Sequence, residues 1–436
     1  MKIGKTFWWI LGLAVASGLA ALLPGISNNK IFLRLVLTWG MILLVGILWS
    51  VLSIIGIRVF RRARILRMQV GQTFVERYDI LNQSFLPKAW VKIIDESDLP
   101  GSEGSRIITN IKAHESRSFN TYSQLTRRGL FQLGPTRIET GDMLGIFSLS
   151  REFDIKSRLM VLPYFFEIGK FPAPFGFLTG GRALRVKTTE VTPYSSGVRE
   201  YMPGDPLRRI HWPISARKNT LIVKEFEKDP LAEVWIFLDA LREGHFEMPE
   251  TLSNDSRWSF LFQEKRRKYS LPPSTFEYAT CLAASIARYY INQRRDVGLS
   301  INAKRYSLLT PDRGERQLVK IFDNLALISA DGTIPLKNLI NAQVSSLVKG
   351  STAIVITVCV DNEIMEIFHA LYEHGIGCVM ILIDGESFGG RSIAKEMERE
   401  LRNLNVITYR IEYGADLASV LQMGSFEHNY VRKLVS

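Results

Sequence analysis

Acidic residues are absent from the first 67 positions of the chain, and cysteine is scarce throughout. The 436 residues include 55 Lys and Arg against 43 Asp and Glu, for a formal net charge of +12. Nine of the basic residues lie within the first 67 positions, so the rest of the chain is nearly neutral. Because the excess positive charge is not spread over the body, we predict no nucleic-acid partner.

The three cysteines, Cys281, Cys359 and Cys378, are too few for the disulfide framework of a small secreted domain. The sequence has no Cys-x-x-Cys pair and no His-Glu-x-x-His array, so a zinc site has no support. Its glycine-rich stretches are not followed by the Gly-Lys-Ser/Thr of a phosphate-binding loop. We therefore predict no cofactor. The hydrophobic share of 46% instead indicates a folded chain, and its length of 436 residues predicts two or three domains.

Two uncharged, mostly apolar runs occupy positions 6–29 and 35–57. The second exceeds the roughly 20 residues that cross a hydrocarbon core, and the first just reaches that length. Five arginines follow between positions 58 and 67, and positive flanks stay on the cytoplasmic side. We predict that residues 1–67 form a hairpin of two transmembrane helices in the inner (cytoplasmic) membrane, with a basic segment near the membrane lipids and the body in the cytoplasm. A cleaved signal peptide is an alternative for the first run, since Lys2 and Lys5 precede it.

The next segment, residues 68–185, has the period-two alternation of β-strands, as in positions 90–95 and 106–111. Turn-forming residues such as those at 100–104 separate these short runs. Strands of this length and spacing predict an antiparallel β-sandwich.

Residues 186–436 are predicted to form an α/β domain. Short apolar runs at 233–239, 297–301, 353–358, 377–383 and 405–409 are separated by helical patterns at 276–293, 317–326, 362–374 and 391–404. This alternation predicts a parallel sheet covered by helices on both faces. Ligands of such sheets bind at the carboxyl ends of the strands, where Asp239 and Asp361 fall.

A dense cluster of charged residues, positions 197–227, opens the α/β domain and is called the signature segment below. Its Pro-Gly-Asp-Pro turn at 203–206 is rigid, and Asp205 is expected to accept backbone N–H bonds from the following helical turn. Leu207, Ile210 and Ile214 recur at helix spacing and predict a helix there.

Arginines on the other faces of that helix can hold carboxylates bidentately, within the protein or on a partner. Two interpretations stay open: an interdomain clamp of buried ion pairs, and a partner-binding surface. The candidate residues are Glu200, Tyr201, Pro203, Gly204, Asp205, Arg208, Trp212, Ser215, Arg217, Lys224 and Glu227.

The arrangement Glu-Tyr-x-Pro-Gly-Asp-x-x-Arg-x-Ile-x-Trp-x-x-Ser-Ala-Arg at 200–217, continued by Leu-Ile-Val-Lys-Glu-Phe-Glu at 221–227, resembles the signature of a bacterial family. This family is catalogued as domain of unknown function 58. The resemblance implies a domain similar to von Willebrand factor type A, which is a Rossmann-like α/β fold. It also implies a MoxR-type AAA+ ATPase as partner, because such ATPases are commonly encoded beside members of the family.

In metal-binding type A domains the first strand ends in Asp-x-Ser-x-Ser, whose oxygens help to hold Mg²⁺. This chain has Asp239-Ala240-Leu241-Arg242-Glu243 there, without either serine. Since Mg²⁺ requires near-octahedral oxygen ligation, Asp239 and Asp361 are predicted to be the remnant of a degenerate site, with no metal bound.

Two functions are consistent with these patterns. The first is a non-enzymatic, membrane-anchored scaffold or adaptor that docks a cytosolic MoxR-type ATPase or its client. The alternative is a hydrolytic enzyme at the strand ends, with Cys359 or Asp361 as the reacting group and His369 or His374 as base. The sequence leaves the oligomeric state open.

Overall fold

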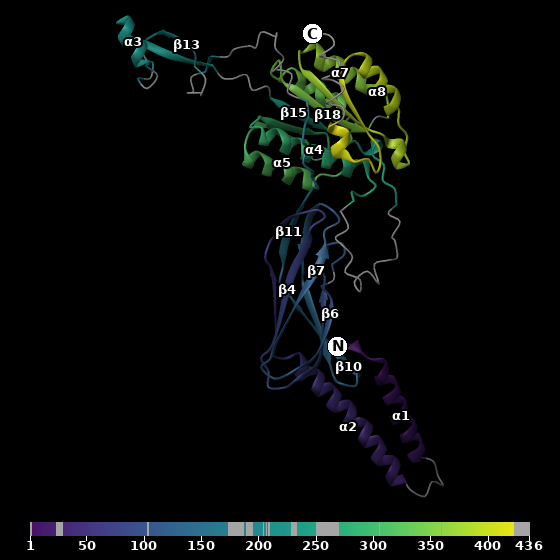
Figure 1. Cartoon of the computed structure of the whole chain (residues 1–436). Coiled ribbons are helices and arrows are strands. Elements are labelled where there is room, and N and C mark those ends of the chain that lie inside the picture. The colour runs from purple at the N-terminus through teal and green to yellow at the C-terminus, as the bar shows by residue number, and fades with distance from the viewer. Residues whose placement is uncertain are drawn as a thin grey trace. The chain divides into compact units, whose positions relative to one another are not determined.

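The computed structural model (Figure 1) describes residues 2–22, 29–102, 104–172, 187–188, 195–203, 205, 207, 210–227, 233–249, 270–304, 306–358 and 360–422. The chain divides into two compact units, Met1–Leu162 and Pro163–Ser436. Each unit is described by itself.

Two apolar helices, α1 (Lys5–Leu22) and α2 (Asn29–Ile54), lie side by side in the first unit (Figure 1). In α2, residues Lys30–Ile54 are long and apolar enough to cross a membrane, whereas the apolar part of α1, Lys5–Ala20, is shorter. The structure thus supports one N-terminal membrane helix by length and composition. The second span stays a prediction.

The rest of the first unit is β-structure. Its strands are β1 (Lys2–Ile3), β2 (Ile57–Ala63), β3 (Arg67–Gln69), β4 (Thr73–Asn82), β5 (Lys88–Asp95), β6 (Arg106–Ile111), β7 (Ser116–Gln124), β8 (Gly129–Leu133), β9 (Thr136–Gly141), β10 (Phe147–Phe153) and β11 (Ser157–Leu162). They form three sheets in the orders β1-β10-β9-β5-β6, β2-β4-β7 and β3-β11-β8. The pairs are antiparallel except β3 with β11, which is parallel and differs from the all-antiparallel prediction.

The first two sheets share one hydrophobic core. Val59 and Ile80 from the β2-β4-β7 sheet meet Val91, Ile93 and Ile138 from the other. In β4 buried residues alternate with exposed or half-buried ones, which is the pattern that the period-two sequence predicts. Two antiparallel sheets therefore pack face to face, as the predicted sandwich requires.

Both apolar helices are attached to the β9–β10 hairpin. Ile3, which precedes α1, pairs with Phe147 of β10. The Ser50 hydroxyl of α2 donates to the Phe147 carbonyl oxygen (3.0 Å). The N-terminal end of α1 and the C-terminal end of α2 are thus held at the same strand.

Lys88 caps the end of α2. Its fully buried side chain donates from Nζ to the carbonyl oxygens of Leu52 (2.9 Å) and Ile55 (3.0 Å). Burial lowers the pKa of this lysine. The carbonyls at a helix C-terminus lack intrahelical partners and carry partial negative charge, so they are suitable acceptors for a buried cation.

The second unit contains a six-stranded sheet in the order β17-β16-β15-β18-β19-β20. Its strands are β15 (Val234–Leu238), β16 (Val297–Ile301), β17 (Ser307–Asp312), β18 (Thr352–Val358), β19 (Gly377–Ile383) and β20 (Ile407–Ile411). The helices are α4 (Thr275–Asn292), α5 (Glu315–Leu327), α6 (Leu336–Val344), α7 (Glu363–Glu373) and α8 (Ala394–Asn403). Short 3₁₀ helices, η3 (Arg242–Gly244) and η5 (Gly385–Phe388), follow β15 and β19.

Helices cover both faces of this sheet. Residues of α6, α7 and α8 form one core with the faces of β15, β18 and β19 that carry Phe237, Val355 and Met380. The other face of β15 packs on α4. The predicted α/β sheet is thus confirmed, but β17 and α6 were not anticipated. β17 is antiparallel and carries Pro311, which suits an edge strand.

The signature segment folds into a small sheet of its own. Strand β14 (Ile222–Glu227) lies between β12 (Lys187–Thr188) and β13 (Ser195–Glu200). Helix α3 (Trp212–Lys218) connects β13 to β14.

A buried ion cluster joins the two sheets of the first unit. The Arg61 guanidinium on β2 contacts Glu76 on β4 (2.7 Å) and Asp95 on β5 (2.8 Å), and all three side chains are 1–2% exposed. Burial acts to lower the pKa of Arg61, but the hydrogen bond that it donates to Glu76 and the charges of Glu76 and Asp95 contribute to a net rise of the pKa. The guanidinium also lies over the Tyr78 ring, 5.3 Å from its centroid.

We predict that Arg61→Met lowers the free energy of unfolding of the first unit by about 3–5 kcal/mol, because it leaves two buried carboxylates without their cation. The matched control is Arg77→Met, which removes an exposed pair with Asp79 and is expected to cost less than about 1 kcal/mol. Pulse proteolysis of the detergent-solubilised chain across a urea series measures both changes. Equal effects of the two substitutions would contradict the prediction.

Candidate functional site

The carboxyl ends of β15, β16 and β18 meet at the point where the strand order reverses, with β15 between the other two. This is the position at which open α/β sheets bind ligands. Asp239, the residue after β15, is 7% exposed. Asn302 follows β16, and Thr357 lies near the end of β18.

Asp239 is hydrogen-bonded to both neighbouring strand ends. One carboxylate oxygen accepts from the Thr357 hydroxyl (2.7 Å), and the other accepts from the Asn302 amide (2.9 Å) and the Leu241 N–H (3.0 Å). The Asn302 side chain also accepts from the Ala240 N–H. The carboxylate thus holds three loops together through buried hydrogen bonds.

Asp361 has a different role. It is exposed, and its carboxylate accepts from the Glu363 N–H (3.1 Å) at the start of α7. Burial, followed by the charges of Asp361 and more weakly Asp239, raises the pKa of Glu363, while Lys337 opposes the shift. The three carboxyl groups therefore lie within electrostatic reach of one another.

This donor set is a poor match for Mg²⁺. The Asp239 carboxylate is already engaged by three protein donors. Among the residues described, no group of three or more His, Cys, Asp or Glu is placed to hold a metal ion. The geometry favours the interpretation of Asp239 as a structural group at the strand ends.

The residues of the hydrolase alternative are not brought together in the described ranges. Cys359 lies outside them. The Nδ1 atoms of His369 and His374 lie 2.6 Å from the Met365 carbonyl oxygen and 2.8 Å from that of Ala370, so each ring contacts its own helix. Cys281 and Cys378 are buried, and burial raises their pKa values strongly, which disfavours the thiolate.

Sequence reasoning missed Asn302, Thr357 and His245 at this edge. The His245 ring lies with Nε2 3.1 Å from the Asp239 carbonyl oxygen and Nδ1 3.0 Å from the Thr275 hydroxyl. A polar residue directly after an apolar strand was the available signal for Asn302. Arg242, three residues after Asp239, is exposed on η3.

Within the signature segment, Arg199 and Asp205 form a partly exposed ion pair. The guanidinium donates to both carboxylate oxygens (2.7 Å each), and Asp205 also accepts from the Met202 N–H (3.0 Å). The described contacts of this carboxylate reach back to β13 and the turn after it. The predicted cap on the following turn stays a prediction, because positions 206, 208 and 209 lie outside the described residues.

The helix of the signature segment begins later than the spacing predicted. Ile210 forms an isolated bridge with Val223 of β14, so it is not helical. Helix α3 starts at Trp212, and the His211 ring accepts from the Ile214 N–H (3.4 Å). The local spacing of apolar residues could not predict that Ile210 pairs with β14.

The other candidates of this segment have separate positions. Ser215 is buried and its hydroxyl accepts from the Ile222 N–H (2.9 Å), which ties α3 to β14. The half-buried Tyr201 donates its N–H to the Leu221 carbonyl oxygen (2.8 Å). Glu200, Pro203 and Arg217 are exposed.

Trp212 is 64% exposed. Gly204 and Arg208 lie outside the described residues, as do the side chains of Lys224 and Glu227. The predicted clamp or docking role of these residues stays a prediction.

Comparison with known proteins agrees with the family resemblance. The model of the family "Protein of unknown function DUF58" matches residues 197–256, which include the signature segment and Asp239. The "Uncharacterized protein YeaD" of Bacillus subtilis (strain 168) is 22% identical over 311 residues, which are 70% of this chain and 69% of that protein.

Solved structures give weaker likenesses. The CARDB domain of a Pyrococcus furiosus protein aligns with 24% of this chain and 91% of its own at 9% identity, with a TM-score of 0.18. A mutant β-glucosidase of Listeria innocua, in complex with laminaribiose, aligns with 22% of this chain and 16% of its own at 11% identity, with a TM-score of 0.15. Scores this low do not establish a shared fold.

We predict that Asp239→Ala lowers the free energy of unfolding of the second unit by at least about 2 kcal/mol, because each buried donor left without an acceptor costs about 1–3 kcal/mol. Asp361→Ala, which removes one exposed acceptor, is expected to cost less than about 1 kcal/mol. Hydrogen exchange of β15 and β18 in the full chain across a urea series measures both.

The same measurement in Mg²⁺ and in EDTA tests the metal interpretation. We expect identical unfolding midpoints in the two buffers. If Mg²⁺ raises the unfolding midpoint of the wild-type protein but not that of Asp239→Ala, this carboxylate is a metal ligand.

Proposed function

We propose that this protein is a non-enzymatic, membrane-anchored adaptor that docks a cytosolic MoxR-type AAA+ ATPase or its client through a type A-like domain. One observation carries the proposal: the signature segment places large apolar side chains on its surface. Met202, Leu207, Trp212 and Leu221 are all exposed. Exposed apolar clusters on a folded protein are typical of binding surfaces.

Backbone hydrogen bonds link the chain next to three of these residues to the start of β14. Tyr201, next to Met202, donates to the carbonyl oxygen of Leu221. His211, next to Trp212, donates to the carbonyl oxygen of Ile222 (2.8 Å). Met202, Trp212 and Leu221 are thus at or next to backbone that is hydrogen-bonded near the start of β14, and an exposed tryptophan is among the residue types most enriched at binding hot spots.

The anchoring part of the proposal has its own support. The N-terminal end of α1 and the C-terminal end of α2 both lie at β10. The path of the chain therefore leads away from β10 along α1 and back to it along α2. That path is expected of two spans with the N-terminus and the body on one side. The arginines at positions 58–67 favour the cytoplasmic side of the inner membrane.

The type A-like part is supported by the sheet order. With the strands counted from β15 along the chain, the order across the sheet is 3-2-1-4-5-6, and the third is the antiparallel edge. The resemblance of the signature segment to the family named above supplies the expected partner. The commitment of Asp239 to structural hydrogen bonds favours binding over catalysis at this edge.

We predict that Trp212→Ala weakens the binding of the full chain, in nanodiscs, to the purified MoxR-type ATPase of the same organism by at least tenfold. Truncating a hot-spot tryptophan costs about 2 kcal/mol or more. Surface plasmon resonance with ATP and with ADP measures the dissociation constant. Tyr372→Ala, which truncates an exposed aromatic residue on α7, is the matched control and is expected to change the constant less than twofold.

Two results would contradict the proposal. If the ATPase does not bind the wild-type chain under either nucleotide, the adaptor function is wrong. If both variants bind as tightly as the wild-type chain, the docking surface lies outside the signature segment.

A further inference from the structure

The tip of the β9–β10 hairpin, residues 142–146, lies beside the middle of α2 instead of beside its end. A Cβ placed on Gly46 would be 3.5 Å from the side chains of Ile146 and Phe147. Gly46 is buried, and Ser50, one turn further along, donates to Phe147. Gly46 precedes the last residue of α2 by about 12 Å along the helix axis, at 1.5 Å per residue.

This position has a consequence for depth if α2 crosses a membrane. The 26 residues of α2 extend about 39 Å, and a hydrocarbon core is about 30 Å thick. The excess length of α2 is therefore smaller than the distance of about 12 Å between Gly46 and the end of the helix. Even with the whole excess at the C-terminal end, Gly46 and the hairpin tip beside it would lie within the apolar region. Tilt of the helix shortens its projection and moves the tip deeper.

The chemistry of the tip suits that depth. Met143 is 67% exposed and Leu144 is 62% exposed, at the turn of a hairpin where polar residues are usual. Met41 and Val45 of α2 are exposed beside them. Burying each of these side chains in an apolar environment is favourable.

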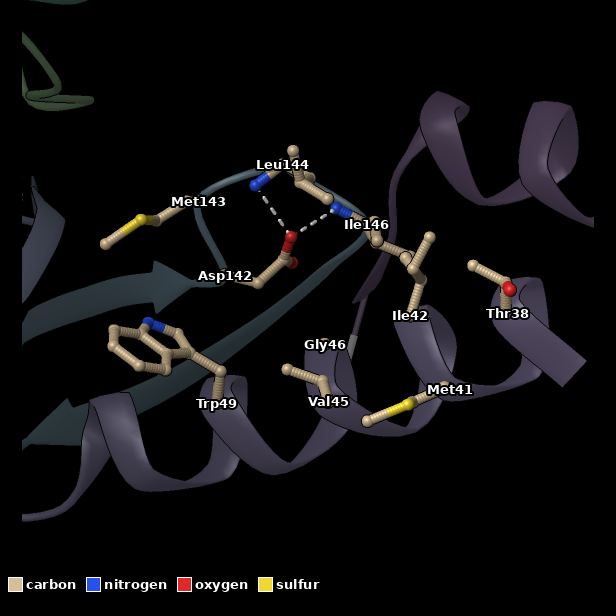
Figure 2. Close-up of a pocket in the computed structure, with 10 residues that line it drawn as sticks. All are labelled: Thr38, Met41, Ile42, Val45, Gly46, Trp49, Asp142, Met143, Leu144 and Ile146. Atoms are coloured by element: carbon tan, nitrogen blue, oxygen red, sulfur yellow. Dashed lines mark hydrogen bonds between the residues drawn. The ribbon is translucent and has the colours of Figure 1, made fainter.

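The backbone of the tip is also prepared for an apolar environment. The Asp142 carboxylate accepts from the N–H groups of Leu144 (2.9 Å), Ile146 (3.1 Å) and Phe147 (2.7 Å), as Figure 2 shows for the first two. The N–H of Gly145 donates to the Asp142 carbonyl oxygen. Unsatisfied backbone groups are costly in lipid, and here one carboxylate satisfies several of them.

Between the tip and α2 is an open pocket of about 470 Å³ (Figure 2), a size within the range of small-ligand sites. Its lining residues are Thr38, Met41, Ile42, Val45, Gly46, Trp49, Asp142, Met143, Leu144 and Ile146. Besides Trp49, the polar side chains of the lining are Thr38 and Asp142, and both are hydrogen-bonded within the protein. The Thr38 hydroxyl donates to the Arg34 carbonyl oxygen (2.8 Å), and the Asp142 carboxylate accepts from its own turn. The pocket therefore offers a largely apolar surface.

We propose that the hairpin tip inserts into the cytoplasmic leaflet beside α2, and that the pocket between them holds an acyl chain of a membrane lipid. The occupant is a lipid because one wall of the pocket is a helix of membrane-spanning length and the other is an exposed Met-Leu pair at the same depth. The proposal rests on the membrane anchoring proposed above, and it is independent of the ATPase.

The test uses the full chain in liposomes, with Leu144→Cys labelled by an NBD maleimide in a Cys359→Ser background. Cys281 and Cys378 are buried with raised pKa values, so they react slowly in the folded protein. We expect blue-shifted NBD emission that lipids with doxyl groups on their acyl chains quench at least twofold. The matched control is Leu130→Cys, an exposed residue on β8 that pairs with Met160 of β11. The β11 label lies at the end of the β-structure away from α1 and α2 (Figure 1), and no quenching is expected for this control.

A second measurement tests the pocket itself. Liposomes containing a phosphatidylcholine with a diazirine in its acyl chain are irradiated, and the peptides that carry lipid are identified by mass spectrometry. We expect adducts on the peptides containing residues 41–49 and 142–146, reduced at least threefold at the hairpin tip by Val45→Trp, which fills the pocket. Adducts on α2 alone, unaffected by Val45→Trp, would overturn the lipid site.

Resistance to carbonate extraction separates failure of this inference from failure of the anchor. If the chain is extracted, the anchoring fails and the insertion fails with it. If the chain resists extraction while NBD at position 144 reports water, only the insertion is overturned. Blue-shifted emission without quenching, together with cross-links between two copies at position 144, would assign the pocket to a second copy and overturn the lipid proposal.

Discussion

Phe147 is the residue at which the two apolar helices and the β-structure of the first unit meet. Its backbone pairs with Ile3 before α1, and its carbonyl oxygen accepts from Ser50 of α2. Lys88 adds a second attachment by capping the end of α2 from a strand of the same sheet. Because one sheet holds both helices, their apolar surfaces have a fixed position relative to the β-structure. The hairpin tip beside Gly46 depends on that constraint.

Much of the architecture follows from hydrophobic periodicity, since each of the apolar runs predicted as strands between 233 and 409 is a strand of one sheet. Local patterns fail where a residue is determined by a distant partner. Ile210 has helical spacing but pairs with Val223 of β14. Lys88 belongs to an alternating strand, and nothing in its sequence neighbourhood indicates that it caps a helix more than thirty residues earlier.

The position of Asp239 at the strand ends could be predicted from the sequence, because the carboxyl ends of parallel strands meet at one edge. Only part of the hydrogen-bond network at these strand ends could be predicted. Asp239 could be recognised after an apolar strand, whereas Asn302 and Thr357 acquire their roles from the order of β16, β15 and β18, which the sequence does not specify. In the structure, neutral donors from the ends of β16 and β18 contact both oxygens of the Asp239 carboxylate.

One pattern recurs at Asp142, Ser215 and Asp239. Asp142 lies in a turn, Asp239 follows a strand and Ser215 lies in α3. Each side chain is buried and accepts hydrogen bonds from backbone or side-chain donors of its own unit. A group whose lone pairs are used in this way costs free energy to recruit for binding a metal or activating water, because its present donors would be left unsatisfied. The exposed side chains near two of these residues are large and apolar: Met143 and Leu144 near Asp142, and Trp212 near Ser215. Surfaces of this composition gain free energy by excluding water, so the same distribution of polar and apolar groups favours a protein that works by binding, to lipid at one end and to a protein partner through the signature segment.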